Sequence, residues 1–155
     1  MEFLAEFHPK VVHFPIAFTL AYILLETVGI IFKKEFFSKA AHLLLFFGVL
    51  GALAAVLTGE QAEEAFEYWN KQSSDLVEAH EQFATYTLWY FTGVLVLRTF
   101  VTIKKKFSGM LKYMFLVLAI AGSYLIYKTG DLGGQMVYKH AVGTEYKNKI
   151  MEAEE

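Results

Sequence analysis

The sequence predicts an all-α protein, a four-helix transmembrane bundle with a short helix on its outer face between the second and third spans. Two observations predict this fold class. The composition is apolar, with 55% hydrophobic residues and a mean hydropathy of +0.38, more than an ordinary soluble domain of 155 residues carries. The apolar residues are also concentrated in four long runs that contain almost no formal charge.

Each run has about the 20 residues that a helix needs to cross the hydrocarbon core of a bilayer. Helices rather than strands are expected, because a spanning segment must satisfy its own backbone polar groups. The spans are predicted at about residues 11–32, 39–58, 80–103 and 107–128, in a single domain of residues 1–155. A charged, mobile tail is expected from about residue 145.

The first span is preceded by the stretch from His8 to Pro15, which contains both prolines of the chain. Prolines are tolerated near a helix start, where backbone N–H groups have no intrahelical partner. After the second span, glutamates recur at spacings of three and four between Gly59 and Tyr68, which predicts the short outer helix. A polar turn is expected at 71–75, with Ser74 capping the third helix.

The glycines that follow the fourth span, Gly130, Gly133 and Gly134, are expected to end its helix. A short extended segment from Gln135 to Tyr138 would then lead to His140.

Basic residues predict the orientation. Eight of the 14 lie around the two short turns: Lys33, Lys34, Lys39, Arg98, Lys104, Lys105, Lys106 and Lys112. The positive-inside rule places these turns in the cytoplasm. Both termini are therefore expected outside, and the resemblance to bacterial membrane proteins described below implies a bacterial inner (cytoplasmic) membrane. The first six residues lack a basic n-region, so no cleavable signal peptide is expected.

Several function classes are excluded. The net charge of −2 gives no indication of nucleic acid binding. The absence of cysteine excludes disulfides, thiolate metal sites, iron–sulfur clusters and c-type haem attachment through this chain. No HExxH, Walker or GxSxG motif is present, so neither a hydrolase nor an ATPase is predicted, and no catalytic residue is assigned.

The even number of spans brings four of the five histidines to one membrane surface: His8, His13, His80 and His140. Imidazoles in such a position suit haem iron, copper, zinc or non-haem iron. Small residues of the second span, from Gly48 to Ala55, would give room for a flat haem macrocycle. The alternative is that they only allow close helix packing.

Carboxylates lie near the same surface. Glu63, Glu64, Glu78 and Glu81 could complete a haem-free metal site, with His80 beside them. The alternative is that this acidic segment is a solvated outer face. No Glu-x-x-His pair is present, so the di-iron bundle pattern is missing.

Glu26 and Arg98 are charged residues within predicted spans, where a lone charge is costly. Both lie about 10 Å from the cytoplasmic turns, at 1.5 Å of rise per residue. They are predicted to form an intramembrane pair or to share a polar cluster with His42. A structural clamp is the first interpretation and a proton route is the second.

Four motifs resemble a family of bacterial membrane proteins catalogued as domain of unknown function 2231. They are His8 to Pro15 (HPxxVHFP), Gly59 with Ala62-Glu63-Glu64, His80-Glu81, and Gly133 to His140 (GGxxVYxH). Ala141 departs from the pattern, because the family has glycine there. Some members have proline at the position of His13. The resemblance covers nearly the whole chain and implies a four-helix membrane domain; joining of similar domains to haem or Rieske modules favours redox work.

The first hypothesis is a haem-b membrane cytochrome that exchanges electrons at the outer face with a quinol or a partner cytochrome. His13 and His80 are its first pair of axial ligands, with His8 and His140 as a second pair or as alternates. The second is a haem-free protein that binds copper, iron or zinc. The third is a structural subunit of a larger complex, and homo-oligomers are compatible with each.

Overall fold

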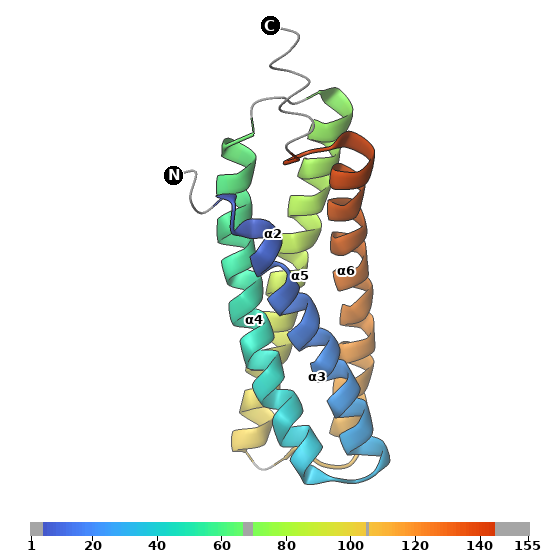
Figure 1. Ribbon diagram of the computed structural model, residues 1–155. Helices are drawn as coiled ribbons and strands as arrows, with labels where there is room; N and C mark the ends of the chain where they lie inside the picture. Colours follow the sequence, from blue (N-terminus) through green and yellow to red (C-terminus); the bar gives the residue numbers. More distant parts are fainter. Residues whose placement is uncertain (1–4, 67–69, 105, 145–155) are drawn as a thin grey trace, which may run out of the picture.

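The computed structural model describes residues 5–66, 70–104 and 106–144, and these form an all-α bundle (Figure 1). No strand occurs in these ranges. The helices are α2 (His8–Val11), α3 (His13–Ile31), α4 (Glu35–Glu64), α5 (Lys71–Ile103) and α6 (Met110–His140).

Four helical segments in the described ranges are long and apolar enough to cross a membrane, with α2 and α3 together forming the first. About 20 residues suffice for the hydrocarbon core. Because α4, α5 and α6 have 30, 33 and 31 residues, each is long enough to project beyond the core. The fold therefore carries helical structure outside the apolar layer, where the chain has its polar motifs.

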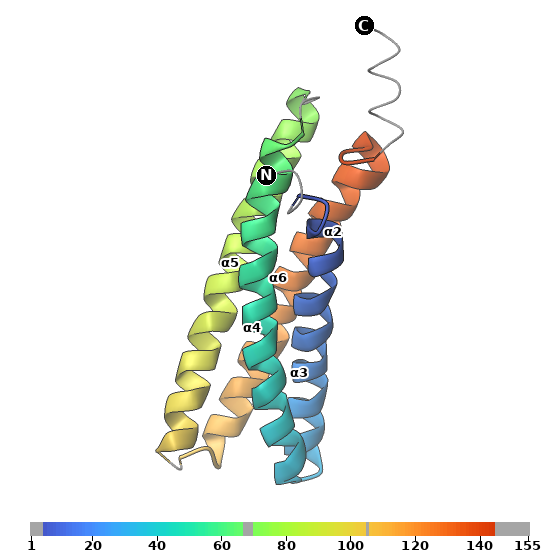
Figure 2. The same ribbon diagram turned by 60° about the vertical axis from the view of Figure 1, so that its left-hand side comes forward.

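The helices form two antiparallel hairpins that pack against each other. The first half joins α2 and α3 to α4, which lie side by side in both views, and the second joins α5 to α6 (Figures 1 and 2). The halves meet where α4 contacts α5 and α3 contacts α6. We call the end with α2 and the last turns of α6 the histidine end. The opposite end, with the α3–α4 and α5–α6 turns, is the lysine end.

Small residues let the helices of the first half approach closely. A β-carbon at Gly48 would lie 2.8 Å from Cγ2 of Thr19, and one at Gly51 would lie 3.1 Å from Cδ of Pro15. A glycine also allows close helix packing in the second half, since a β-carbon at Gly122 would lie 2.5 Å from Cζ of Phe91. The glycines of α4 thus seat α3, which supports the close-packing interpretation over room for a macrocycle.

The first span is interrupted just after its start. Pro9 occupies the first turn of α2, and Val12 separates α2 from α3. Pro15 has no N–H to donate to the preceding turn, so the junction has fewer hydrogen bonds than a continuous helix. His8 therefore lies on a separate four-residue arm.

The short outer helix at 59–68 is not a separate element. Residues 59–64 instead continue α4 without a break. Contacts of α4 with α2 and α5 support this extension of the helix. Residues 67–69, the end of the predicted segment, lie outside the described ranges.

The polar turn predicted at 71–75 is also wrong. The third helix begins at Lys71, with Asn70 as its N-cap rather than Ser74. The Asn70 side chain accepts from the backbone N–H of Ser73 at 2.9 Å, and the Ser73 hydroxyl accepts from the Asn70 N–H at 3.0 Å. This capping box satisfies two N-terminal donors.

The predicted helix break at the α6 glycines, and the extended segment after them, are wrong as well. The helix continues to His140, and side-chain bonds along one face support it, from Lys139 to Gln135 at 2.9 Å and from Gln135 to Asp131 at 2.8 Å. The helix ends at Ala141, which has a left-handed φ of 51°. The tail predicted from about residue 145 lies outside the described ranges.

Candidate functional site

Two imidazoles, one from each half of the bundle, lie together at the histidine end. His8 comes from α2 and His80 from α5, and their ring centroids are 6.5 Å apart with an interplanar angle of 89°. Both side chains are partly buried. His8 contacts α4 and His80 contacts α6, so the pair lies where four helices meet.

The tautomer of His8 follows from its partner. The Thr58 hydroxyl donates its only proton to the backbone carbonyl of Ala54 at 2.9 Å. Its oxygen can then only accept from His8, whose Nδ1 lies 3.2 Å away. With the Thr58 proton assigned to Ala54, the neutral His8 ring carries its proton on Nδ1.

The tautomer of His80 follows in the same way. Its Nδ1 lies 3.0 Å from the backbone carbonyl oxygen of Thr129, and a carbonyl oxygen can only accept. The Thr129 hydroxyl is in turn 3.1 Å from the hydroxyl of Thr87 on α5. Hence the α5–α6 contact holds the His80 ring in place.

Both rings thus present Nε2 with a free lone pair. The hydrogen bonds to Thr58 and Thr129 both engage Nδ1, so neither of them uses Nε2. A neutral imidazole binds a metal through such a nitrogen, and metal-binding histidines typically donate the other ring N–H to a carbonyl or similar oxygen. The His8–His80 pair is therefore the part of the described bundle whose ring nitrogens could hold a metal.

Each ring rests against a glycine that lacks the atom it would meet. A β-carbon at Gly59 would lie 3.1 Å from Cε1 of His8, and one at Gly133 would lie 3.2 Å from Cε1 of His80. Contacts this short require the ring to shift by a few tenths of an ångström. Two glycines from the sequence motifs therefore let the imidazoles lie directly on α4 and α6.

The other two predicted histidines are placed differently. His13 lies in the first turn of α3 and is exposed, so the structure brings His8 rather than His13 next to His80. His140 is in the last turn of α6, two turns beyond the glycine that contacts His80. No contact joins His140 to the imidazole pair in the described part of the chain.

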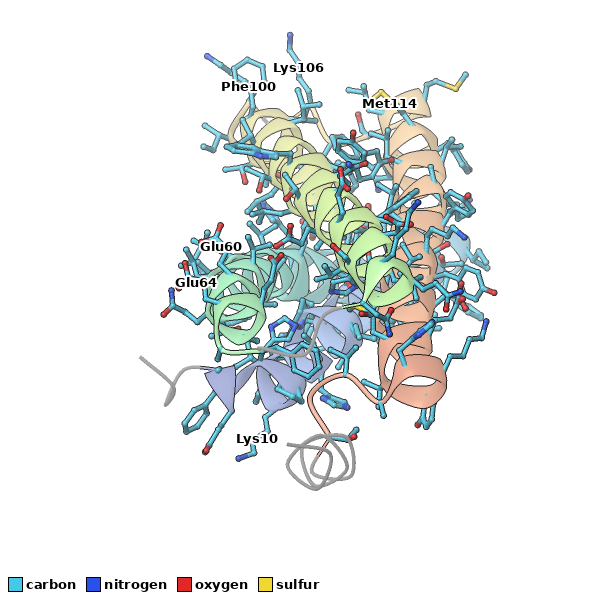
Figure 3. The ribbon with its side chains drawn as sticks, turned by 90° about the horizontal axis from the view of Figure 1, so that it is seen from above. Lys10, Glu60, Glu64, Phe100, Lys106 and Met114 are labelled. Carbon is cyan, nitrogen blue, oxygen red and sulfur yellow. The ribbon has the colours of Figure 1, made fainter. Side chains whose placement is uncertain are left out.

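The predicted carboxylate ligands lie on the outer parts of α4 and α5. Glu63 and Glu81 are close enough to interact, whereas Glu64 is exposed and, in the view onto the histidine end, projects with Glu60 away from α6 (Figure 3). Among the described residues, no three His, Asp or Glu side chains gather as a metal-binding group. The structure therefore brings the predicted ligands together as two pairs, the imidazoles of His8 and His80 and the carboxyl groups of Glu63 and Glu81, and not as a larger group among the described residues.

The charges predicted to pair in the membrane do lie together. Arg98 Nη2 is 3.1 Å from Oε2 of Glu26 and 2.8 Å from Oγ of Ser38, and Glu26 and Arg98 are almost fully buried. The guanidinium carbon lies 3.1 Å above the Phe107 ring. His42 is not in direct contact with the pair; its Nε2 bonds the hydroxyl of Thr99 at 2.9 Å. We call Glu26, Ser38 and Arg98 the charged cluster.

Sequence reasoning missed the partners that orient the imidazoles. Thr58 lies at the end of an apolar run and Thr129 contributes its backbone carbonyl, so neither has a signal of its own. The only indication in the sequence was that Thr58 directly precedes Gly59, the first residue of the predicted acidic motif.

The fold and site define a class: an all-helical membrane protein with a pair of ligand-competent imidazoles at one end of its bundle. The chain belongs to the family described as predicted membrane protein, domain of unknown function 2231, whose family model matches residues 5–146. No curated protein and no solved structure matches the chain significantly.

Proposed function

We propose that this protein is a membrane haem-b cytochrome for electron transfer, with His8 and His80 as the axial ligands. The observation that carries the proposal is the pair of imidazoles whose Nδ1–H groups are held by Thr58 and Thr129 and whose Nε2 atoms are free. Haem, when bound, would supply one-electron redox chemistry.

The spacing of the rings supports this assignment. Two imidazoles on opposite sides of one metal ion place their ring centroids about 6 Å apart, because each metal–nitrogen bond is about 2.0 Å long. The observed separation is 6.5 Å.

The number of ligands also favours haem over most haem-free ions. Haem iron needs only two ligands from the protein, whereas zinc and non-haem iron usually take three or four. The described residues offer two imidazoles and no group of three ligands. The protein would tune the potential through the threonine hydrogen bonds and through burial of the rings.

Orientation and partners are part of the same proposal. The lysines of the two short turns favour a cytoplasmic lysine end in a bacterial inner membrane, so that the histidine end and both termini face outward. Electrons would then be exchanged at the outer face with a quinol or a partner cytochrome. A homo-oligomer or a larger complex is compatible with this role.

An absorption spectrum tests the proposal. Protein expressed with ample haem and purified in mild detergent is expected to show a Soret band and the reduced α-band of bis-imidazole haem b. His8→Ala and His80→Ala should each abolish the low-spin spectrum. His13→Ala is the matched control, because this exposed histidine lies five residues from His8 and should leave the spectrum unchanged. No Soret band, even after haem titration, would contradict the proposal.

Copper is the second candidate, and one observation favours it. Gly48 and Gly51 of α4 lie directly against α3, so helix packing fills the space that the sequence suggested for a macrocycle, whereas a bare ion needs little space. Imidazole suits copper. Elemental analysis separates the candidates: copper without haem absorbance, lost in His80→Ala, would replace the haem assignment.

A further inference from the structure

The charged cluster contains buried polar atoms that its ion pair does not satisfy. Oε1 of Glu26 and Nε of Arg98 have no hydrogen-bond partner among the described residues, and neither has the hydroxyl of Tyr22. These three side chains are at most 2% exposed. Orphaned polar atoms are costly in a spanning segment, because lipid cannot satisfy them.

The three side chains lie within one helical turn of each other along α3 and its contact with α5. Glu26 is paired with Arg98 at 3.1 Å, and Tyr22 lies one helical turn before Glu26 on the same face of α3. Side chains four residues apart on a helix are neighbours. The Tyr22 hydroxyl also interacts electrostatically with both charged partners.

Their chemistry is complementary. The Arg98 Nε–H can only donate, the Glu26 Oε1 atom can only accept when ionised, and the Tyr22 hydroxyl can do both. A molecule that accepts one hydrogen bond and donates two would satisfy all of them. Buried water makes about three hydrogen bonds of this kind to otherwise unsatisfied groups.

Direct closure of the ion pair is the competing arrangement. Oε2 of Glu26 already accepts from Arg98 Nη2, with Ser38 Oγ 3.4 Å away, so the carboxylate is held on its Oε2 side. The guanidinium is held against the Phe107 ring and by the Ser38 carbonyl oxygen, at 3.3 Å from Nη2. Because both side chains are held in this way, Glu26 Oε1 and Arg98 Nε do not bond each other.

We propose that Tyr22, Glu26 and Arg98 form a binding site for one internal water molecule in the half of the bundle near the lysine end. This water accepts from Arg98 Nε–H and donates to Glu26 Oε1 and the Tyr22 oxygen. The site is independent of the imidazole pair, and it makes the charged cluster a hydrated network rather than a dry ion pair.

X-ray radiolytic labelling of the full chain in lipid nanodiscs tests this site, because a bound water converted to a hydroxyl radical oxidises the side chain next to it. Tyr22 is expected to be oxidised several-fold more than Phe91, which is equally buried and packs edge-on against it. The double variant Glu26→Leu/Arg98→Leu should reduce Tyr22 oxidation to the Phe91 level. The matched control is Thr102→Val, since the Thr102 hydroxyl contacts Arg98 at Nη1 (3.4 Å) and at its backbone carbonyl oxygen (2.7 Å) but is not bonded to Nε.

Equal oxidation of Tyr22 and Phe91 in the unmodified protein would overturn the proposal. A structure that resolves ordered water gives a second measurement that needs no variant. Density bonded to at least two of the three atoms supports the site. A direct bond between Glu26 Oε1 and Arg98 Nε, with no water beside them, overturns it.

Discussion

Polar side chains enter this bundle at two levels, and the two levels differ in how their atoms are satisfied. In the half near the lysine end, Arg98 meets Glu26 and Ser38 from the other half of the protein, so opposite charges neutralise each other. At the histidine end, each imidazole donates to its own half and leaves Nε2 free. The charged cluster thus holds the two halves together, whereas the imidazole pair keeps ring nitrogens that could bind a ligand.

The largest expected effect is on stability, at the charged cluster. Arg98→Leu should lower the free energy of unfolding by about 3–5 kcal/mol, because it leaves the buried Glu26 carboxylate uncompensated. Thermal or denaturant unfolding in detergent measures the loss. The double variant Glu26→Leu/Arg98→Leu should recover most of it, since no buried charge remains. An Arg98→Leu protein as stable as its parent would show that the cluster does not clamp the halves.

The second expected effect is on metal or haem affinity, at the histidine end. Thr58→Val keeps the shape of the side chain but removes the acceptor of the His8 Nδ1–H, so affinity should fall about 10–100-fold. Titration of the bound group measures it. Thr27→Val is the control, because the Thr27 hydroxyl bonds only the Ile23 carbonyl of its own helix. Equal affinities in the two variants would rule out an orienting role for Thr58.

A smaller effect is expected where His80 rests on α6. Gly133→Ala should shift the absorption maximum or potential of the bound group, because its β-carbon would lie 3.2 Å from the ring. Gly130→Ala, one turn away with nothing within 4 Å, should leave both unchanged. Because both substitutions favour helix equally, their comparison isolates the contact with the imidazole. Identical spectra would mean that the ring position does not depend on this glycine.

The smallest expected effect is a gain in stability. Ala141 ends α6 with a φ of 51°, where an L side chain is strained. Ala141→Gly should therefore raise the free energy of unfolding by about 1 kcal/mol. Unfolding titrations check this result. A loss of stability would mean that the alanine methyl makes a contact worth more than the strain.

The sequence was most informative where one physical constraint dominates. The spans follow from the apolar runs, since lipid imposes a minimum length, and the meeting of Glu26 with Arg98 follows from their equal depth. The outer ends of the helices were misjudged because Gly130, Gly133 and Ser74 were interpreted by local propensity. Tertiary packing decided there: Gly133 stays helical because it receives the His80 ring.

For the candidate site, the sequence predicted that histidines would lie at one end of the bundle, but not which of them would lie together. Topology brought histidines to one end, but it could not distinguish His8 from His13, five residues apart at a helix start. The break at Val12 decides between them, because it places His8 on an arm that contacts Thr58 and Gly59 of α4. Whether Glu63, Glu64, Glu81 or His140 take part in binding stays a prediction.

The division of the hydrogen bonds between the halves has a consequence for biogenesis. His8 is anchored by Thr58 within the first hairpin, and His80 by Thr129 within the second. Each hairpin can thus orient its own ring as it leaves the insertion machinery, before the other is synthesised. Ligation through both rings must wait until the hairpins associate, so cofactor loading would report that assembly is complete.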